Sequence, residues 1–148
     1  FNREGFLLAT QNEERYERFL EDTTLLQEMA NLYVRLDKKK KHKTYNEVHY
    51  NFIIDLIRQA KEKGIKLVFI FHPKLNKFSF RELVPMLKFI PEQNLINIAD
   101  PDEYPVLYAV GCSFNETHYN YDGARAYTEA VAEKFMEILN HTDKKLSE

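Results

Sequence analysis

The stretch Ile65-Lys66-Leu67-Val68-Phe69-Ile70-Phe71 decides the fold. It is nearly all apolar and rich in β-branched and aromatic residues, and His72-Pro73 follows it directly. A continuous apolar run of this length is typical of a strand that is buried on both faces, as in a parallel sheet. The sequence therefore predicts a parallel strand near 65–71.

Working outward from this run, we expect one further strand and three main helices. The short run Leu95–Ile98 reads as a second strand, and apolar residues recur at helical spacing near 11–37, 45–63 and 122–140. The order helix–strand–helix–strand–helix indicates an α/β fold with a parallel sheet. The residues expected in the core are Leu67, Phe69, Ile70, Ile98, Val131 and Phe135.

Polar residues mark where the helices should begin. Thr10–Glu13 and Thr44–Glu47 both fit a capping box, in which two side chains satisfy free amides of the first turn. Asp100-Pro101 is typical of a helix start, with Asp as N-cap and Pro at the first helical position. Ser79–Glu82 opens a shorter helix near Pro85, and Val106–Val110 is compatible with a helix or a short strand.

Composition bounds the class of protein. The chain has 148 residues, 44% of them hydrophobic, with 21 basic and 23 acidic side chains, which is typical of one globular domain. A formal net charge of −2 gives no argument for nucleic-acid binding. Cys112 is the one cysteine, so no intramolecular disulfide is possible. Neither a signal peptide nor a membrane-spanning run is present, and because Phe1 is not a methionine we expect a piece of a longer product.

The segment most suggestive of chemistry is Asn115–Ala124, a polar loop that runs into an amphipathic helix. Asn120 can cap that helix, and Gly123 in its first turn would let another backbone approach closely. His118 lies just before the helix start, held near a fixed scaffold. This is a favourable position for a general base.

His118, Asn120, Gly123 and Ala124, followed by an apolar helix, resemble the closing block of the SGNH/GDSL-type hydrolases. The likeness is to their DltD-like and alginate O-acetyltransferase-like branch, and it covers about 47–141. It implies a three-layer, flavodoxin-like fold of which 1–148 would be a single domain or the C-terminal part, with the nucleophile-bearing N-terminal part absent. It also implies that His118 is the general base. The family's acid position, three residues before the histidine, is Asn115 here, and an amide orients the ring without supplying charge.

The same resemblance implies an acyl esterase or acyltransferase that acts on an acylated glycan, a cell-envelope polymer or a small acyl ester. It implies no cofactor, an extracytoplasmic location, and membrane attachment only through segments outside this chain. The alternative is a non-catalytic module of the same fold that binds glycan or a protein partner. A Gly-Asp-Ser sequence upstream would favour the enzyme.

No Gly-Asp-Ser occurs in these 148 residues. Ser113 or Cys112, beside Gly111, is the weaker nucleophile candidate, because it follows no clear strand. His72 follows a strand where open α/β sheets bind ligands, although a loop histidine beside a proline is the plainer interpretation. The histidines show no metal-binding spacing, and the chain has no glycine-rich phosphate loop.

Two further expectations concern surfaces. The basic run Lys38–Lys41, with Lys43, fits a solvated helix end better than a site for an anionic glycan, a lipid surface or a nucleic acid. Two strands are few for an open sheet. We therefore expect an exposed apolar sheet edge or face, with self-association through it or a missing N-terminal half.

Overall fold

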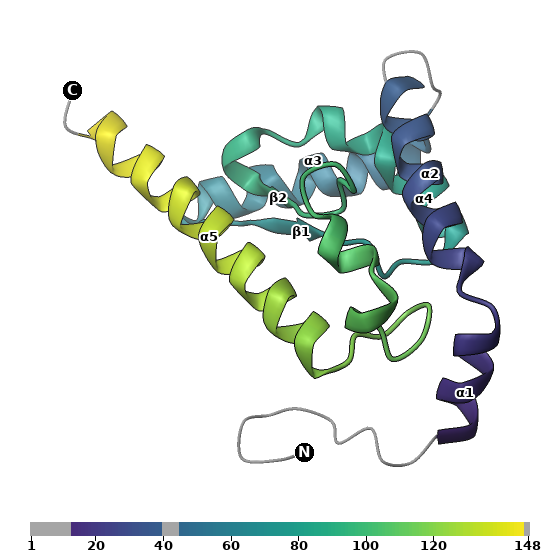
Figure 1. Ribbon diagram of the computed structural model, residues 1–148. Helices are drawn as coiled ribbons and strands as arrows, with labels where there is room; N and C mark the ends of the chain where they lie inside the picture. The colour runs from purple at the N-terminus through teal and green to yellow at the C-terminus, as the bar shows by residue number, and fades with distance from the viewer. Residues whose placement is uncertain (1–12, 40–44, 147–148) are drawn as a thin grey trace.

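The computed structural model describes residues 13–39 and 45–146, with side chains placed for 16–39 and 45–140. Strands β1 (Phe69–Phe71) and β2 (Leu95–Asn97) pair in parallel, with Ile70 opposite Ile96. The chain is thus an α/β protein with a small parallel sheet, as the sequence predicts (Figure 1). Strand β1 is shorter than expected, because residues 65–68 approach the sheet without pairing. Strand β2 ends one residue earlier than expected, at Asn97.

Over the described ranges, five α-helices and several 3₁₀ segments surround the strands. The 3₁₀ segments are Val84–Phe89, Glu92–Asn94, Pro105–Tyr108 and Val110–Cys112. Pro85 and Pro105 each lie in the first turn of such a segment, where the missing N–H costs nothing. The α-helices are α1 (Glu13–Glu21), α2 (Thr24–Lys39), α3 (Glu47–Glu62), α4 (Lys77–Leu83) and α5 (Tyr121–Leu146).

The single helix predicted over 11–37 is wrong, because the segment divides into α1 and α2. Asp22 lies at the break, and its Oδ1 accepts hydrogen bonds from the backbone N–H of Thr24, at 3.0 Å, and from the Thr24 hydroxyl, at 2.5 Å. This local bonding competes with a continuous helix. Apolar spacing alone carries no sign of it.

The predicted helix starts have mixed outcomes. Thr10 and Thr44 lie outside the described residues, and α3 is capped by Asn46, whose Oδ1 accepts from the N–H groups of Val48 and His49. Asn76 caps α4 in the same way. The helix expected after Asp100 is wrong: one turn forms there, and a short 3₁₀ segment follows.

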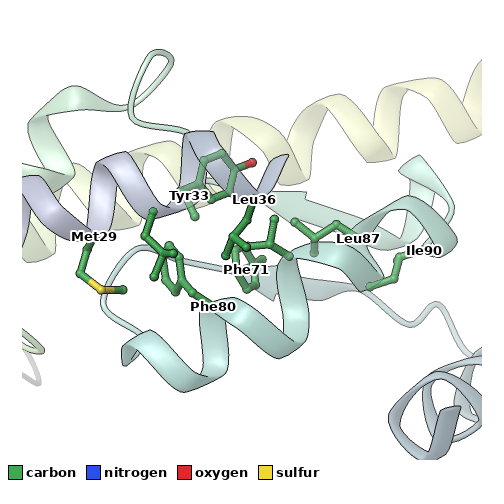
Figure 2. Packing of buried hydrophobic residues seen from close by; sticks show 10 residues of the cluster. Met29, Tyr33, Leu36, Phe71, Phe80, Leu87 and Ile90 are labelled. Carbon is green, nitrogen blue, oxygen red and sulfur yellow. The ribbon is translucent and has the colours of Figure 1, made fainter. Parts of the chain in front are cut away.

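One core lies between the sheet and the helices α2 and α4. Phe71 from β1 contacts Phe80 of α4 with ring centroids 5.5 Å apart, and Tyr33 of α2 meets Phe80 edge-on at 6.2 Å (Figure 2). The Tyr33 hydroxyl also accepts a hydrogen bond of 2.7 Å from Asn97 Nδ2, which joins α2 to β2. The buried members are Met29, Leu32, Tyr33, Leu36, Phe71, Phe80, Val84, Leu87, Ile90 and Ala99.

A second core lies between the sheet and α5. Ile96 of β2 alternates to the opposite face from its neighbours and packs with Ala130 and Ile138 of α5. Ile98 and Leu107 complete this cluster with no exposed surface. Helices therefore lie on both faces of the sheet, and on one face α5 packs on β2.

Of the residues predicted to lie in the core, Ile98 is fully buried. Three others are only half-buried, namely Leu67, Phe69 and Val131. The prediction is wrong for Ile70, which is 46% exposed, and for Phe135, which is 41% exposed. The side chain of Ile70 points to the α5 face, but α5 covers β2 and leaves β1 open. Phe135 lies at the margin of the buried stripe of α5.

The helix α3 buries less than its amphipathic pattern predicts. Val48 and Phe52, which lie one turn apart on the same face, are both strongly exposed, and no residue of α3 is fully buried. The helix contacts the rest of the molecule through Ile53 and through an aromatic group formed by Tyr45, Tyr50 and Phe89. The expected apolar exposure is therefore present, on α3 and on β1.

Candidate functional site

The loop that carries His118 lies beside the carboxyl end of β1. Lys74, three residues after the last residue of that strand, reaches it with a single side chain. Its ammonium donates to Ser113 Oγ at 2.7 Å and to the backbone oxygen of Asn115 at 3.4 Å. The loop thus occupies the edge of the sheet where parallel α/β proteins place their ligands.

Lys74 is buried, with 7% of its surface exposed. Desolvation lowers the pKa of its ammonium to about 8, and the nearby Glu116 opposes part of that shift. The ammonium also lies 5.0 Å from the centroid of the Tyr119 ring, so the aromatic face replaces some of the lost hydration. A lysine in this position holds the loop against the sheet edge.

His118 and Asn115 form the contact that the sequence predicts. His118 Nδ1 lies 3.0 Å from Asn115 Oδ1 and 3.0 Å from the Thr117 hydroxyl. Asn115 Oδ1 also accepts from the backbone N–H of Thr117 at 2.9 Å, so this atom of the amide must be the oxygen. An oxygen can only accept, which places the proton of the neutral imidazole on Nδ1 and the lone pair on Nε2.

Asn115 and His118 differ in how much of their surface is exposed to solvent. Asn115 is almost fully buried, which fixes its amide, whereas the His118 ring is exposed. Within the described part of the chain, Nε2 of His118 has no hydrogen-bond partner. With the proton on Nδ1, the unprotonated Nε2 of the exposed ring is open to solvent. A general base needs such an accessible nitrogen.

The start of α5 fixes the loop from its other side, as predicted. Asn120 Oδ1 accepts from the N–H of Gly123 at 3.0 Å, and Asn120 Nδ2 donates to the Gly111 oxygen at 2.6 Å. A Cβ at Gly123 would lie 1.8 Å from the backbone oxygen of Cys112. The close backbone approach expected at this glycine is therefore present, and it locks 111–112 against the helix.

Ser113 contacts an amine at the distance seen in serine–lysine nucleophile pairs. Its side chain, however, is 0% exposed, and its hydroxyl donates to the Ala109 oxygen at 3.0 Å. A substrate cannot reach this oxygen without displacing the loop. Cys112 is partly exposed, and its backbone is held between Asn120 and Gly123. Both residues serve as structural supports of the loop.

His72 lies at the same sheet edge but is not brought to His118. Its Nδ1 accepts the backbone N–H of Lys74 at 3.3 Å, and its ring meets Tyr127 of α5 edge-on at 6.0 Å. Burial lowers the pKa of the imidazole. His72 therefore packs against α5 and accepts a hydrogen bond from the backbone that follows β1.

Two participants escaped the sequence prediction, Lys74 and Tyr119. Lys74 lies 39 residues from Ser113 along the chain, so no local spacing relates them. The sequence feature that could have pointed to Lys74 is its position just after a predicted strand, two residues beyond His72. The Tyr119 hydroxyl is buried and has no hydrogen-bond partner in the part that the structure describes, and burial raises the pKa of this phenol.

Over 13–39 and 45–146 no cluster of three metal-ligating side chains occurs. Across those residues, too, no helix is long and apolar enough to cross a bilayer. One hollow lies between α2 and α4 rather than at His118. Comparisons of the chain with protein-family models, with curated proteins and with solved structures gave no match.

Proposed function

We propose that the chain is the C-terminal part of an SGNH-like acyl esterase or acyltransferase with a three-layer fold, in which His118 is the general base. The acyl carrier or acceptor is a glycan or another cell-envelope polymer outside the cytoplasm. The serine nucleophile belongs to a segment outside these 148 residues. No cofactor takes part in the reaction.

The observation that carries the proposal is the contact between the His118 ring and the Asn115 amide oxygen. Asn115 Oδ1, 3.0 Å from Nδ1, keeps the proton on that nitrogen and leaves Nε2 as the base. Nε2 would take the proton of the serine hydroxyl as its oxygen attacks the acyl carbonyl, and would give that proton to the departing alkoxide, so that an alcohol leaves and the acyl group stays on the serine as an ester. Nε2 would then take a proton from water or a sugar hydroxyl as its oxygen attacks this ester, and would return a proton to the serine oxygen as the ester bond breaks.

Asn115 makes this a weakened version of such a site. Its oxygen orients the imidazole, but it supplies no negative charge to the imidazolium that forms in the transition state. Asn115→Asp should therefore increase the rate, by up to roughly 10⁴-fold, the loss seen when a triad acid is converted to its amide. Because the side chain is buried and accepts the Thr117 N–H, an aspartate keeps the present geometry.

The test is hydrolysis of a short-chain acyl ester by the complete gene product and its variants Asn115→Asp and His118→Ala. We expect His118→Ala to lose activity with an unchanged thermal unfolding curve, and Asn115→Asp to gain it. His49→Ala is the matched control, because it removes a part-exposed imidazole from α3, where the ring lies 3.9 Å from Glu82 and outside the Asn115–His118 contact.

A second candidate function is a non-catalytic module that binds glycan or a protein partner. It is favoured by Asn115, which supplies no negative charge to His118, and by the burial of Ser113, which closes this chain's own candidate serine to substrate. The sequence of the gene upstream of Phe1 separates the two candidates. A Gly-Asp-Ser after a strand pattern supports the enzyme, whereas its absence together with three equally inert proteins supports the binding module.

A further inference from the structure

The groove between α2 and α4 is lined by an unusual set of charges. It has a volume of about 350 Å³ and is bordered by Glu28, Asn31, Leu32, Arg35, Lys77 and Arg81. Residues 28, 31, 32 and 35 lie on one face of α2, and residues 77 and 81 lie one turn apart on α4. The helices α2 and α4 lie side by side (Figure 1), and residues from both line the groove.

Ion pairing neutralises only one of the three cations. Lys77 Nζ lies 2.5 Å from a carboxylate oxygen of Glu28, and this pair spans the groove. Among the residues that the structure describes, neither Arg35 nor Arg81 has a carboxylate within ion-pairing distance. The groove therefore carries an uncompensated charge of +2 on two guanidinium groups, one from each helix.

The remaining lining residues give the groove an apolar floor and a polar rim. Leu32 is buried and belongs to the core between α2 and the sheet. Asn31 Oδ1 accepts a hydrogen bond of 3.1 Å from Gln27 Nε2, so the oxygen of this amide is engaged and its nitrogen is the donor that Asn31 can offer to a ligand. Because Tyr33 and Phe80 pack α2 against α4, the two sides of the groove are held at a fixed separation. A site built on packed helices is preformed.

We propose that this groove binds the phosphate group of a small organic phosphate, such as a sugar phosphate. A phosphate monoester carries a charge close to −2 at pH 7, which matches the two guanidinium groups, whereas a carboxylate would leave one of them uncompensated. Arginine is the residue best suited to phosphate, because its planar fork can donate two parallel hydrogen bonds. Leu32 and Asn31 provide an apolar contact and donors for the organic part. The site is separate from His118 and does not depend on the acyl-transfer proposal.

The test is isothermal titration calorimetry of the 148-residue chain with glucose 6-phosphate, inorganic phosphate, glucuronate and glucose. We expect glucose 6-phosphate to bind best and glucose not to bind. Arg35→Gln and Arg81→Gln should each weaken binding by roughly tenfold or more, the usual loss for a charge-assisted hydrogen bond. Arg125→Gln is the control, because it removes the same charge from an exposed arginine of α5 that lies near Glu129.

Two further measurements address the charge match directly. Glu28→Gln releases Lys77 from its pair and should tighten binding, and binding should weaken as the pH falls below about 6, where the phosphate loses its second charge. Unfolding curves of each variant exclude misfolding as the cause. Binding of glucuronate as tight as that of glucose 6-phosphate would overturn the assignment to a phosphate. Equal affinity for inorganic phosphate would overturn the assignment to an organic phosphate, and insensitivity to both arginine substitutions would overturn the site itself.

Discussion

At the scale of single residues, Gly123 is the most restrictive position of the candidate site. A methyl group there would overlap the backbone oxygen of Cys112, which cannot swing away as a side chain can. We expect Gly123→Ala to lower the free energy of unfolding by about 3 kcal/mol, the upper part of the usual range for overpacking. Urea denaturation measures this. Gly111→Ala is the matched control, because open space surrounds its Cβ position, and an equal loss there would contradict the explanation.

Lys74 is the residue whose ionisation should be visible in stability. Burial holds its pKa at about 8 in the folded protein, below the ordinary value of 10.5 in the unfolded chain. Between these two pH values the unfolded state binds more protons, so stability rises with pH, by up to about 1.4 kcal/mol per pH unit. Below pH 8 both states are protonated, and the full cost of burying the charge remains.

The measurement compares urea denaturation of the wild type and Lys74→Met at pH 7.5 and pH 9.5, as rough values on either side of the shifted pKa. We expect the wild type to gain stability relative to Lys74→Met at the higher pH. The exposed Lys61→Met reports the general effect of removing one lysine charge. A difference between wild type and Lys74→Met that does not change with pH would mean that Lys74 is not desolvated.

What the sequence predicts at this scale depends on separation along the chain. Asn115, His118, Asn120 and Gly123 lie within nine residues. The cap by Asn120 and the close approach at Gly123 are predicted from the residues, and the Asn115–His118 contact is predicted from the family resemblance. Lys74 joins the loop from 39 residues away, through a contact that only the pairing and packing of the strands creates. The catalytic role of His118 stays a prediction, since geometry gives the tautomer but not the reaction.

At the scale of elements, the caps of α3 and α5 should differ in their effect on stability. Asn120 caps α5, which covers the sheet, whereas Asn46 caps α3, which buries no residue fully. We expect Asn120→Ala to lower global stability by about 1 kcal/mol or more, because it also removes the bond to the Gly111 oxygen. Asn46→Ala should fray α3 with little global loss.

Hydrogen exchange separates these two outcomes. Asn120→Ala should speed exchange in the strands and in α5 together, while Asn46→Ala should speed it in the first turns of α3 alone. Asn120→Asp is the control that keeps the capping oxygen and loses only the donor. If Asn46→Ala lowered protection in β1 and β2 as much as Asn120→Ala does, α3 would be an integral part of the fold.

Elements also show why the sequence prediction failed where it did. The apolar spacing over 11–37 continues across Asp22, but the hydrogen bonds of that side chain to Thr24 end one helix and begin another. Asp100-Pro101 has the residues of a helix start, yet the chain turns once and then enters Pro105–Tyr108. In both places short-range bonding overrode the periodic pattern. Such helix boundaries depend on whether local side-chain hydrogen bonds to the backbone replace the helical ones, and the spacing of apolar residues carries no information about this.

At the scale of the whole molecule, the sheet is left open on one side. The pattern of Ile65–Phe71 predicts a strand buried on both faces, but α5 covers β2 and leaves Ile70 exposed. Ile65, Val48 and Phe52 are exposed as well. Exposed apolar residues at the edge and on the face of a sheet favour contact with another polypeptide. We expect either further chain or a second copy to cover the residues named above.

We therefore predict that the isolated 148-residue chain self-associates through α3 and β1. Sedimentation velocity should show the average mass rising with concentration, because burying Phe52 and Ile70 removes apolar surface from water at about 25 cal/mol per Å². Phe52→Glu and Ile70→Thr should each shift the chain toward monomer, the first by adding charge to an exposed helix face and the second by removing apolar surface while keeping a β-branched residue. Phe78→Glu is the matched control, since Phe78 is a strongly exposed phenylalanine of another helix, α4. A wild-type chain that stays monomeric at every concentration, or an equal response to Phe78→Glu, would show that the open sheet and α3 do not form an association surface.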